Sequence, residues 1–219
     1  MVFGGSVAAA RVYTEWLVGA GVDRGVIGPR EPDRIWTRHV LNCAVLASVI
    51  APDASVVDIG SGAGLPGIPL AIARPDLTVT LVEPLERRTT FLLEVVQALE
   101  LSNVTVLRGR ADEVVDRCGG ADVVTSRAVA PLARLMAWSV PLVRAGGEVL
   151  AMKGASAVEE IERDGAAVAS LGVVDLSVLT VGEGVVDPPT SVIRGIVRVA
   201  PRTGRKGGKP TAKQRRAAR

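Results

Sequence analysis

The stretch Val56–Gly67, VVDIGSGAGLPG, decides the fold of this chain. It opens with a short β-branched run, passes through three alternating glycines and ends where an apolar, helix-forming segment begins. A strand, a glycine-rich turn and a helix start form a nucleotide-binding site, because glycine lets a ligand approach the backbone and the helix start offers free N–H groups. The stretch therefore predicts an α/β protein that binds a nucleotide-like ligand at this turn.

Strand-like and helical segments alternate after this turn, which predicts right-handed parallel crossovers and an open, mostly parallel sheet with helices on both faces. The last two strand-like runs, 173–181 and 192–200, have no helix between them and predict an antiparallel hairpin at the sheet edge. The other expected strands are 55–59, 77–82, 103–107, 121–125 and 147–152, and the expected helices are 66–73, 85–101, 131–143 and 157–170, with a short acidic helix before 121.

The two ends of the chain differ from this middle part. Helical apolar spacing over 6–19, and again from Pro32 to Ile50, predicts an N-terminal helical extension, since proline suits the first turn of a helix. We therefore expect an extension over residues 1–50, a ligand-binding domain over 51–201 and a tail over 202–219. The tail lacks apolar periodicity, so we expect it to be disordered.

Charge is divided unevenly along the chain. The 219 residues hold 26 Lys and Arg against 23 Asp and Glu, a net charge of +3, but residues 202–219 contribute eight basic residues and no acid. The body therefore carries −5, and the basic tail favours an anionic partner. Two distant cysteines, no signal peptide and no apolar run of about 18 residues predict a cytoplasmic protein with no membrane segment.

The spacing of the glycines indicates which ligand binds. Asp58, Gly60, Gly62 and Gly64 form the pattern D-x-G-x-G-x-G, which resembles the first motif of the class I S-adenosylmethionine (SAM) methyltransferases. A dinucleotide fingerprint can also be read, from Gly62 to Gly67, and it leaves a nicotinamide-dependent oxidoreductase as an alternative. In a true dinucleotide fingerprint the first glycine directly follows the strand. Here the glycine that directly follows the strand is Gly60, whereas the fingerprint would begin at Gly62. SAM is therefore the expected cofactor.

Two further acids stand where a SAM site needs them. Glu83 ends the second predicted strand, where an acid takes the ribose hydroxyls, and Asp112 follows the third, where an acid reaches the adenine amino group. The carboxyl ends of successive parallel strands converge on one crevice. Two simpler interpretations remain open: Glu83 as a solvated strand-end charge, and Asp112 as the N-cap of a helix over 113–117.

A longer set of motifs is more specific. The string Asp58–Leu70, DIGSGAGLPGIPL, with Ser126–Ala128 and Met152–Gly154, resembles the bacterial 16S rRNA guanine-N7 methyltransferase family, also called glucose-inhibited division protein B. Upstream, Arg38–Asn42 resembles the Arg-His-aliphatic-Leu-Asp segment of that family, with Asn42 where aspartate is usual. The resemblance covers about residues 30–155.

This resemblance implies a class I SAM-dependent methyltransferase fold, which is Rossmann-like, and methyl transfer to N7 of a guanine in a 16S rRNA loop near the decoding centre. The resemblance also implies that five residues line the SAM site, namely Gly60, Leu65, Ala111, Asp112 and Arg127.

The expected chemistry needs little from the protein. Guanine N7 already carries a lone pair, so no general base is required and alignment of the reactants supplies the catalysis. The chain has a single histidine, His39, which we expect to be a hydrogen-bonded helix residue, and we expect no metal site. Arg127 and Lys153 are candidates for positioning the RNA or its base, and Lys153 also leaves open a ribose 2′-O-methyltransferase.

The expected partner is 16S rRNA or the small ribosomal subunit, bound by a protein acting as a monomer, with the basic tail on the phosphate backbone. A non-catalytic ribosome-binding factor is a third alternative. Because the body is acidic, its RNA-binding face must be a local basic patch. The candidate residues are Arg30, Arg34, Arg38, Arg127, Arg134 and Lys153.

Overall fold

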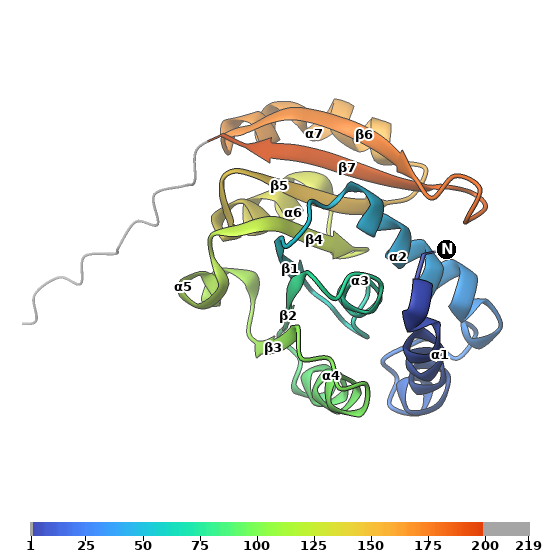
Figure 1. Cartoon of the computed structure of the whole chain (residues 1–219). Coiled ribbons are helices and arrows are strands. Elements are labelled where there is room, and N and C mark those ends of the chain that lie inside the picture. The colour runs from blue at the N-terminus through green and yellow to red at the C-terminus, as the bar shows by residue number, and fades with distance from the viewer. Residues whose placement is uncertain (1, 199–219) are drawn as a thin grey trace, which may run out of the picture.

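A computed structural model describes residues 2–198, and the basic tail lies outside the described residues (Figure 1). Seven strands form one sheet in the order β3-β2-β1-β4-β5-β7-β6. The strands β1 to β5 are parallel, whereas β7 runs antiparallel to both β5 and β6. The edge hairpin predicted by the sequence is thus confirmed. The bounds are β1 Ser55–Ile59, β2 Thr78–Glu83, β3 Val104–Arg108, β4 Ala121–Arg127, β5 Val143–Lys153, β6 Val173–Val181 and β7 Thr190–Val197.

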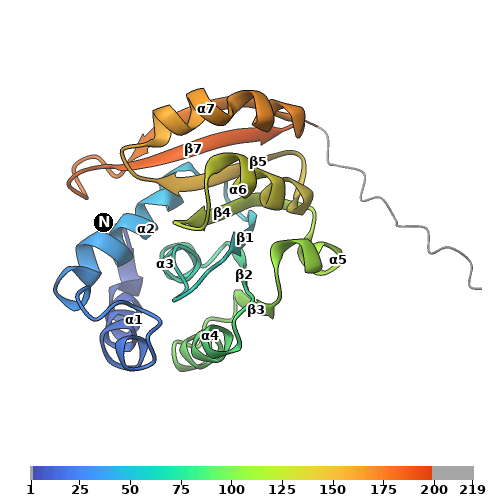
Figure 2. The same cartoon turned by 180° about the vertical axis from the view of Figure 1, so that it is seen from behind.

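Helices cover both faces of the sheet (Figures 1 and 2). Neighbouring strand residues face opposite sides, so Val56 of β1 joins the core beneath α3 and α4, while Val57 joins the core beneath α6 and α7. Both cores are closed by fully buried apolar side chains, which explains the β-branched runs of the sequence. The helices are α3 Gly67–Ala73, α4 Glu86–Ala98, α5 Val115–Cys118, α6 Leu132–Ser139 and α7 Ala157–Ser170.

The N-terminal extension packs on the α3 face of the sheet. Its first part is α1, Val7–Trp16, continued by a π-helical turn over Leu17–Gly21. Tyr13 of α1 is fully buried and its hydroxyl donates a hydrogen bond of 2.8 Å to the carbonyl oxygen of Ala63 in the glycine loop. The extension therefore shares one core with the sheet and contacts the loop that the sequence assigns to the ligand.

The second part of the extension is irregular in its helical winding. Pro32 opens it as predicted, in a 3₁₀ turn over Pro32–Arg34. A π-helical stretch over Ile35–Leu41 follows, then α2, Asn42–Ala44, and a final 3₁₀ segment over Val45–Val49. The sequence predicted one regular helix here, so the winding is a correction.

Several element bounds also differ from the predictions. The predicted helix 131–143 ends as a 3₁₀ turn over Val140–Leu142, and β5 begins at Val143 rather than 147, because Pro141 cannot continue the α-helix. The last strand is Thr190–Val197 rather than 192–200, of which 199–200 are outside the described residues. Over residues 2–198, none of the helices has the length and apolar content needed to cross a membrane.

Candidate active site

The glycine loop lies across the ends of β1 and β2. Gly60, Gly62 and Gly64 have φ angles of +66°, +59° and +97°, in the left-handed region that favours glycine. The N–H groups of Gly60 and Ser61 donate to the carbonyl oxygen of Val82, at 2.8 and 3.2 Å. At Gly64, a Cβ atom would collide with Ile68. The sequence therefore specifies this loop in two ways: its glycines can adopt the left-handed backbone conformation, and Gly64 leaves no room for a side chain.

Asp58 lies beneath the loop and lines neither of the two cavities described below. Its side chain is fully buried, and Oδ2 accepts a hydrogen bond of 3.0 Å from the N–H of Gly67, the first residue of α3. Oδ1 has no partner among the described residues. Burial raises the pKa of Asp58 to about 7. The position of Asp58 indicates that it supports the loop and α3, whereas the sequence placed it among the cofactor contacts.

This pKa predicts an unusual pH dependence of stability. Between the ordinary value of 3.8 and about 7, Asp58 is protonated in the folded chain and ionised in the unfolded chain. The Asp58 contribution to the free energy of unfolding is therefore expected to fall as pH rises through this range, by at most about 4 kcal/mol. In urea titrations across the range, Asp58→Asn should remove this fall. Asp116→Asn, at an exposed acid, should follow the wild type, and parallel curves for all three proteins would contradict the assignment.

A crevice of about 420 Å³ opens where β1 to β4 end. The sheet order changes direction between β1 and β4, and ligands of open α/β sheets bind at such a switch point. Four predicted cofactor residues line it: Gly60, Glu83, Ala111 and Asp112. The other predicted residues, Asp58, Gly62, Gly64, Leu65 and Arg127, lie outside its lining.

Glu83 is buried, which contradicts the interpretation as a solvated strand-end charge. One carboxylate oxygen accepts the N–H of Gly62 and the other the N–H of Leu85, both at 3.0 Å. Arg88 of α4 lies 3.7 Å from the same carboxylate. Glu83 thus joins the glycine loop to the end of β2 while forming part of the crevice wall.

Asp112 is the opposite case, with 70% of its side chain exposed. Its described contact is an ion pair with Arg110 at 3.8 Å. The carboxylate of Glu113, not that of Asp112, accepts the N–H of Arg110 at 2.9 Å and caps the turn Ala111–Glu113. The N-cap interpretation of Asp112 is therefore wrong, and its carboxylate remains accessible to a ligand in the crevice.

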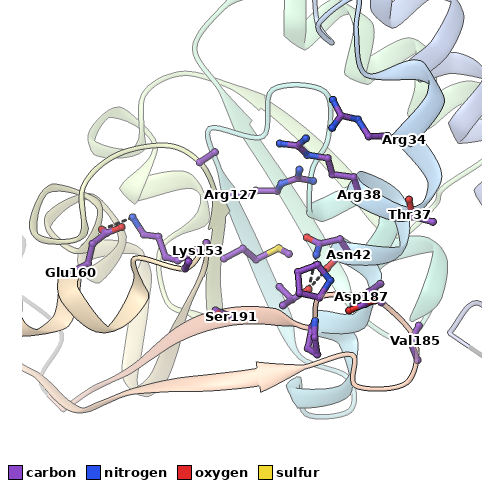
Figure 3. Close-up of a pocket in the computed structure, with 18 residues that line it drawn as sticks. Arg34, Thr37, Arg38, Asn42, Arg127, Lys153, Glu160, Val185, Asp187 and Ser191 are labelled. Carbon is purple, nitrogen blue, oxygen red and sulfur yellow. Dashed lines mark hydrogen bonds and ion pairs between the residues drawn. The ribbon is translucent and has the colours of Figure 1, made fainter.

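A larger cavity of about 1130 Å³ lies on the other side of β4 (Figure 3). Its walls come from the second part of the N-terminal extension, the ends of β4 and β5, and the loop 185–189 between β6 and β7. Ala128, whose φ angle is +52°, lines both the crevice and this cavity. The two hollows therefore adjoin directly after β4.

Arg127 reaches into the larger cavity. Its Nη2 lies 2.6 Å from Nδ1 of His39, and its Nη1 lies 3.2 Å from Sγ of Cys43. Figure 3 shows the guanidinium groups of Arg127, Arg38 and Arg34 gathered on one side of the cavity. Contacts of Arg127 and of Leu65 with the cofactor stay predictions.

Lys153 lines the same cavity, but its ammonium group is turned away toward α7 (Figure 3). Nζ donates to the carbonyl oxygen of Ala130 and to Glu160, both at 2.8 Å. Glu160 also accepts the N–H of Leu132 at 3.0 Å. Lys153 and Glu160 therefore hold the loop between β4 and α6 in place.

The predicted basic patch is only partly assembled. Arg34, Arg38, Arg127 and Lys153 line the cavity, whereas Arg30 and Arg134 do not. The Arg134 guanidinium instead lies 4.8 Å above the ring of Trp138. Arg88 and the loop 185–189 also line the site, and no local sequence pattern pointed to them. Over residues 2–198, no three Asp, Glu, His or Cys side chains are placed to hold a metal ion.

The fold is that of the class I SAM-dependent methyltransferases. Solved structures with this architecture include Aeropyrum pernix fibrillarin with bound S-adenosyl-L-methionine, at a TM-score of 0.55 and 20% identity over 73% of this chain and 75% of that one. M. jannaschii TYW2 in complex with AdoMet matches at a TM-score of 0.58 and 19% identity, over 74% of this chain and 76% of that one. At such identities the likeness concerns the fold.

The sequence comparisons narrow this class to one family. The model of the family described as rRNA small subunit methyltransferase G matches residues 6–188. The Streptomyces avermitilis protein of that name is 56% identical over 200 residues, covering 91% of this chain and 84% of the relative. A Corynebacterium glutamicum relative of the same name is 55% identical over 194 residues, covering 88% and 87%. The chain belongs to this family, which confirms the resemblance found in the sequence.

Proposed function

We propose that this chain transfers the methyl group of SAM to N7 of a guanine in 16S rRNA of the small ribosomal subunit, acting as a monomer in the cytoplasm. The observation that carries the proposal is the junction at Ala128 of a glycine-loop crevice with a larger arginine-lined cavity. The crevice suits a nucleoside-containing cofactor and the cavity suits an anionic substrate. The names of the relatives add the substrate class, ribosomal RNA of the small subunit.

The residues of the crevice fit SAM. At Gly60 the backbone itself forms part of the crevice wall. A Cβ atom there would lie 3.0 Å from the Val129 side chain, so this position requires glycine. Apolar side chains such as Ile59, Val82 and Leu85 offer surface to an adenine ring. Glu83 and Asp112 would hold the ribose hydroxyls and the adenine amino group, respectively. When bound, SAM supplies a methyl group on a positively charged sulfur.

The larger cavity has the charge that an RNA substrate needs. Arg34 and Arg38 expose more than half of their side chains, at 56% and 55%, and both line the cavity. Their guanidinium groups would hold phosphates on either side of the target nucleotide. Because the lone pair of guanine N7 is already available, the chain has to hold the base in line and exclude water, and it need not remove a proton.

Incubation of the purified chain with labelled SAM and small ribosomal subunits or their naked rRNA tests the proposal. We expect label in N7-methylguanosine after digestion. Label on a ribose 2′ oxygen would overturn the N7 assignment in favour of the ribose alternative. Binding of NAD without binding of SAM would favour an oxidoreductase, and rRNA binding without transfer would favour a non-catalytic factor. Sedimentation of the chain alone checks the monomer.

The exposed acid of the crevice allows a clean binding experiment. Asp112→Ala should weaken SAM binding by about 10- to 100-fold, the value of one hydrogen bond to a charged group. Stability should not change, because Asp112 is exposed. Isothermal calorimetry measures the affinity, and Asp116→Ala supplies a control at another exposed acid outside the crevice lining. Unchanged affinity in Asp112→Ala would remove Asp112 from the cofactor site.

The basic tail, residues 202–219, is proposed to add phosphate contacts. Eight cations and no acid make it the most positive part of a chain whose remainder carries −5. Deleting the tail should weaken rRNA binding and flatten its salt dependence by about 0.7–0.9 in log–log slope for each phosphate that the tail neutralises. SAM affinity should be unchanged. If SAM binding collapses instead, the tail is part of the folded body.

A further inference from the structure

A chain of three side chains joins the N-terminal extension to the wall of the larger cavity. Oε2 of Glu31 lies 2.7 Å from Nε2 of His39, and Nδ1 of His39 lies 2.6 Å from Nη2 of Arg127. His39 is 9% exposed. Ala128, which lines both hollows, directly follows Arg127.

The chemistry of the three groups fixes where the protons lie. An arginine guanidinium donates hydrogen bonds and accepts none, so Nδ1 of His39 must be the acceptor. Nε2 then carries the imidazole proton and donates it to the carboxylate of Glu31. This arrangement requires a neutral histidine. The hydrogen bond from Nη2, one of the two terminal nitrogens of Arg127, to His39 fixes the orientation of the guanidinium group.

We infer that His39 is a positioning residue: its neutral imidazole, held by Glu31, orients the Arg127 guanidinium toward an oxyanion bound beside Ala128. The inference rests on the proposed function for the identity of that oxyanion. Two sources share this chemistry, the carboxylate of SAM and a phosphate of the RNA. Glu31 and His39 touch neither ligand and act only through Arg127.

The electrostatic surroundings of His39 favour the neutral form. The charged groups that face it are Glu31, Arg38 and Arg127. Burial lowers the pKa of His39 from its ordinary value of 6.5, the hydrogen bond that His39 donates to Glu31 opposes this, and the two arginines lower the pKa again. A proton on Nδ1 of His39 would turn this acceptor into a donor and place the imidazolium and the Arg127 guanidinium, two cations, side by side. We therefore expect the contact between His39 and Arg127 to break at acidic pH.

Nuclear magnetic resonance tests the proton arrangement without any ligand. The chain has one histidine, so the imidazole nitrogen signals of an untagged chain belong to His39 alone. We expect Nε2 protonated and Nδ1 unprotonated near neutral pH, with a titration midpoint that rises in Arg127→Leu. A proton on Nδ1 at neutral pH, or a midpoint unaffected by Arg127→Leu, would overturn the inference. If the chain proved not to methylate rRNA, the predicted signals of Nε2 and Nδ1 would be unaffected, because this test uses no ligand.

Two substitutions then separate the two ends of the imidazole. Asparagine can place an amide oxygen near the Nδ1 position and accept from Arg127, whereas glutamine places an amide nitrogen near the Nε2 position and faces Glu31. His39→Gln should weaken oxyanion binding by about 10- to 100-fold, and His39→Asn by no more than about threefold.

Two titrations identify the oxyanion, one of SAM in the absence of RNA and one of small-subunit rRNA in the absence of SAM. If His39→Gln lowers the affinity for SAM, the SAM carboxylate faces Arg127. If it lowers the affinity for rRNA, an RNA phosphate faces Arg127. In the affected titration the wild type should also lose affinity in acid, with a midpoint that matches the His39 signals, and His39→Asn should lack this loss. Equal affinities of the two folded variants in both titrations would overturn the inference.

Discussion

Glu83→Ala is expected to lower SAM affinity by at least about 100-fold. The substitution removes the proposed acceptor for the ribose hydroxyls, and it also leaves the N–H groups of Gly62 and Leu85 without their carboxylate partner. The glycine loop would then lose its connection to the end of β2. Calorimetric titration with SAM measures the loss, and circular dichroism shows whether the variant is folded.

Glu86→Ala is the matched control for Glu83→Ala. Glu86 lies three residues further on, at the start of α4, and 73% of its side chain is exposed in an ion pair with Arg108. Exposed pairs of this kind contribute little, so the control should bind SAM with wild-type affinity. A folded Glu83→Ala variant that binds as tightly as the control would contradict the assignment of the crevice.

The substitution Lys153→Met is expected to have the second large effect, a loss of stability. The Lys153 and Glu160 side chains are only 10% and 13% exposed, so Lys153→Met would leave a largely covered carboxylate whose nearest remaining cation is Arg163, at 4.0 Å. The free energy of unfolding should fall by at most about 3–5 kcal/mol. Urea titration at neutral pH measures the change.

The double variant Lys153→Met, Glu160→Gln separates this role from a role in catalysis. A neutral glutamine removes the charge that has lost its lysine partner and can still accept the N–H of Leu132 through its amide oxygen, so most of the stability should return. If Lys153→Met is as stable as the wild type but no longer methylates rRNA, the lysine acts on the substrate, as the sequence suggested.

The sequence predicted those parts of the site that follow from short-range patterns. The glycine loop could be placed because its spacing and its β-branched strand are local, and Glu83 and Asp112 because parallel strands bring their ends together. Alternating apolar runs were sufficient for the sheet and its edge hairpin. Each of these inferences needs only the period of a strand or helix and the direction of a crossover.

Contacts between distant segments could not be predicted in this way. His39 and Arg127 are 88 positions apart, and no pattern within either segment records that their side chains meet. The larger cavity likewise depends on how the irregular second part of the extension packs beside the loop 185–189. Asp58 illustrates a different limit, because a motif position does not reveal whether the side chain points toward the ligand or beneath the loop.

The proposed activity of this chain is methylation of guanine N7 in 16S rRNA of the small ribosomal subunit. Mapping of N7-methylguanosine along this rRNA, from cells that carry the gene and from cells that lack it, tests this claim most directly. We expect one N7-methylguanosine that is present with the gene, absent without it, and not restored by Glu83→Ala. Identical N7-methylguanosine maps from the two kinds of cell would contradict the claim.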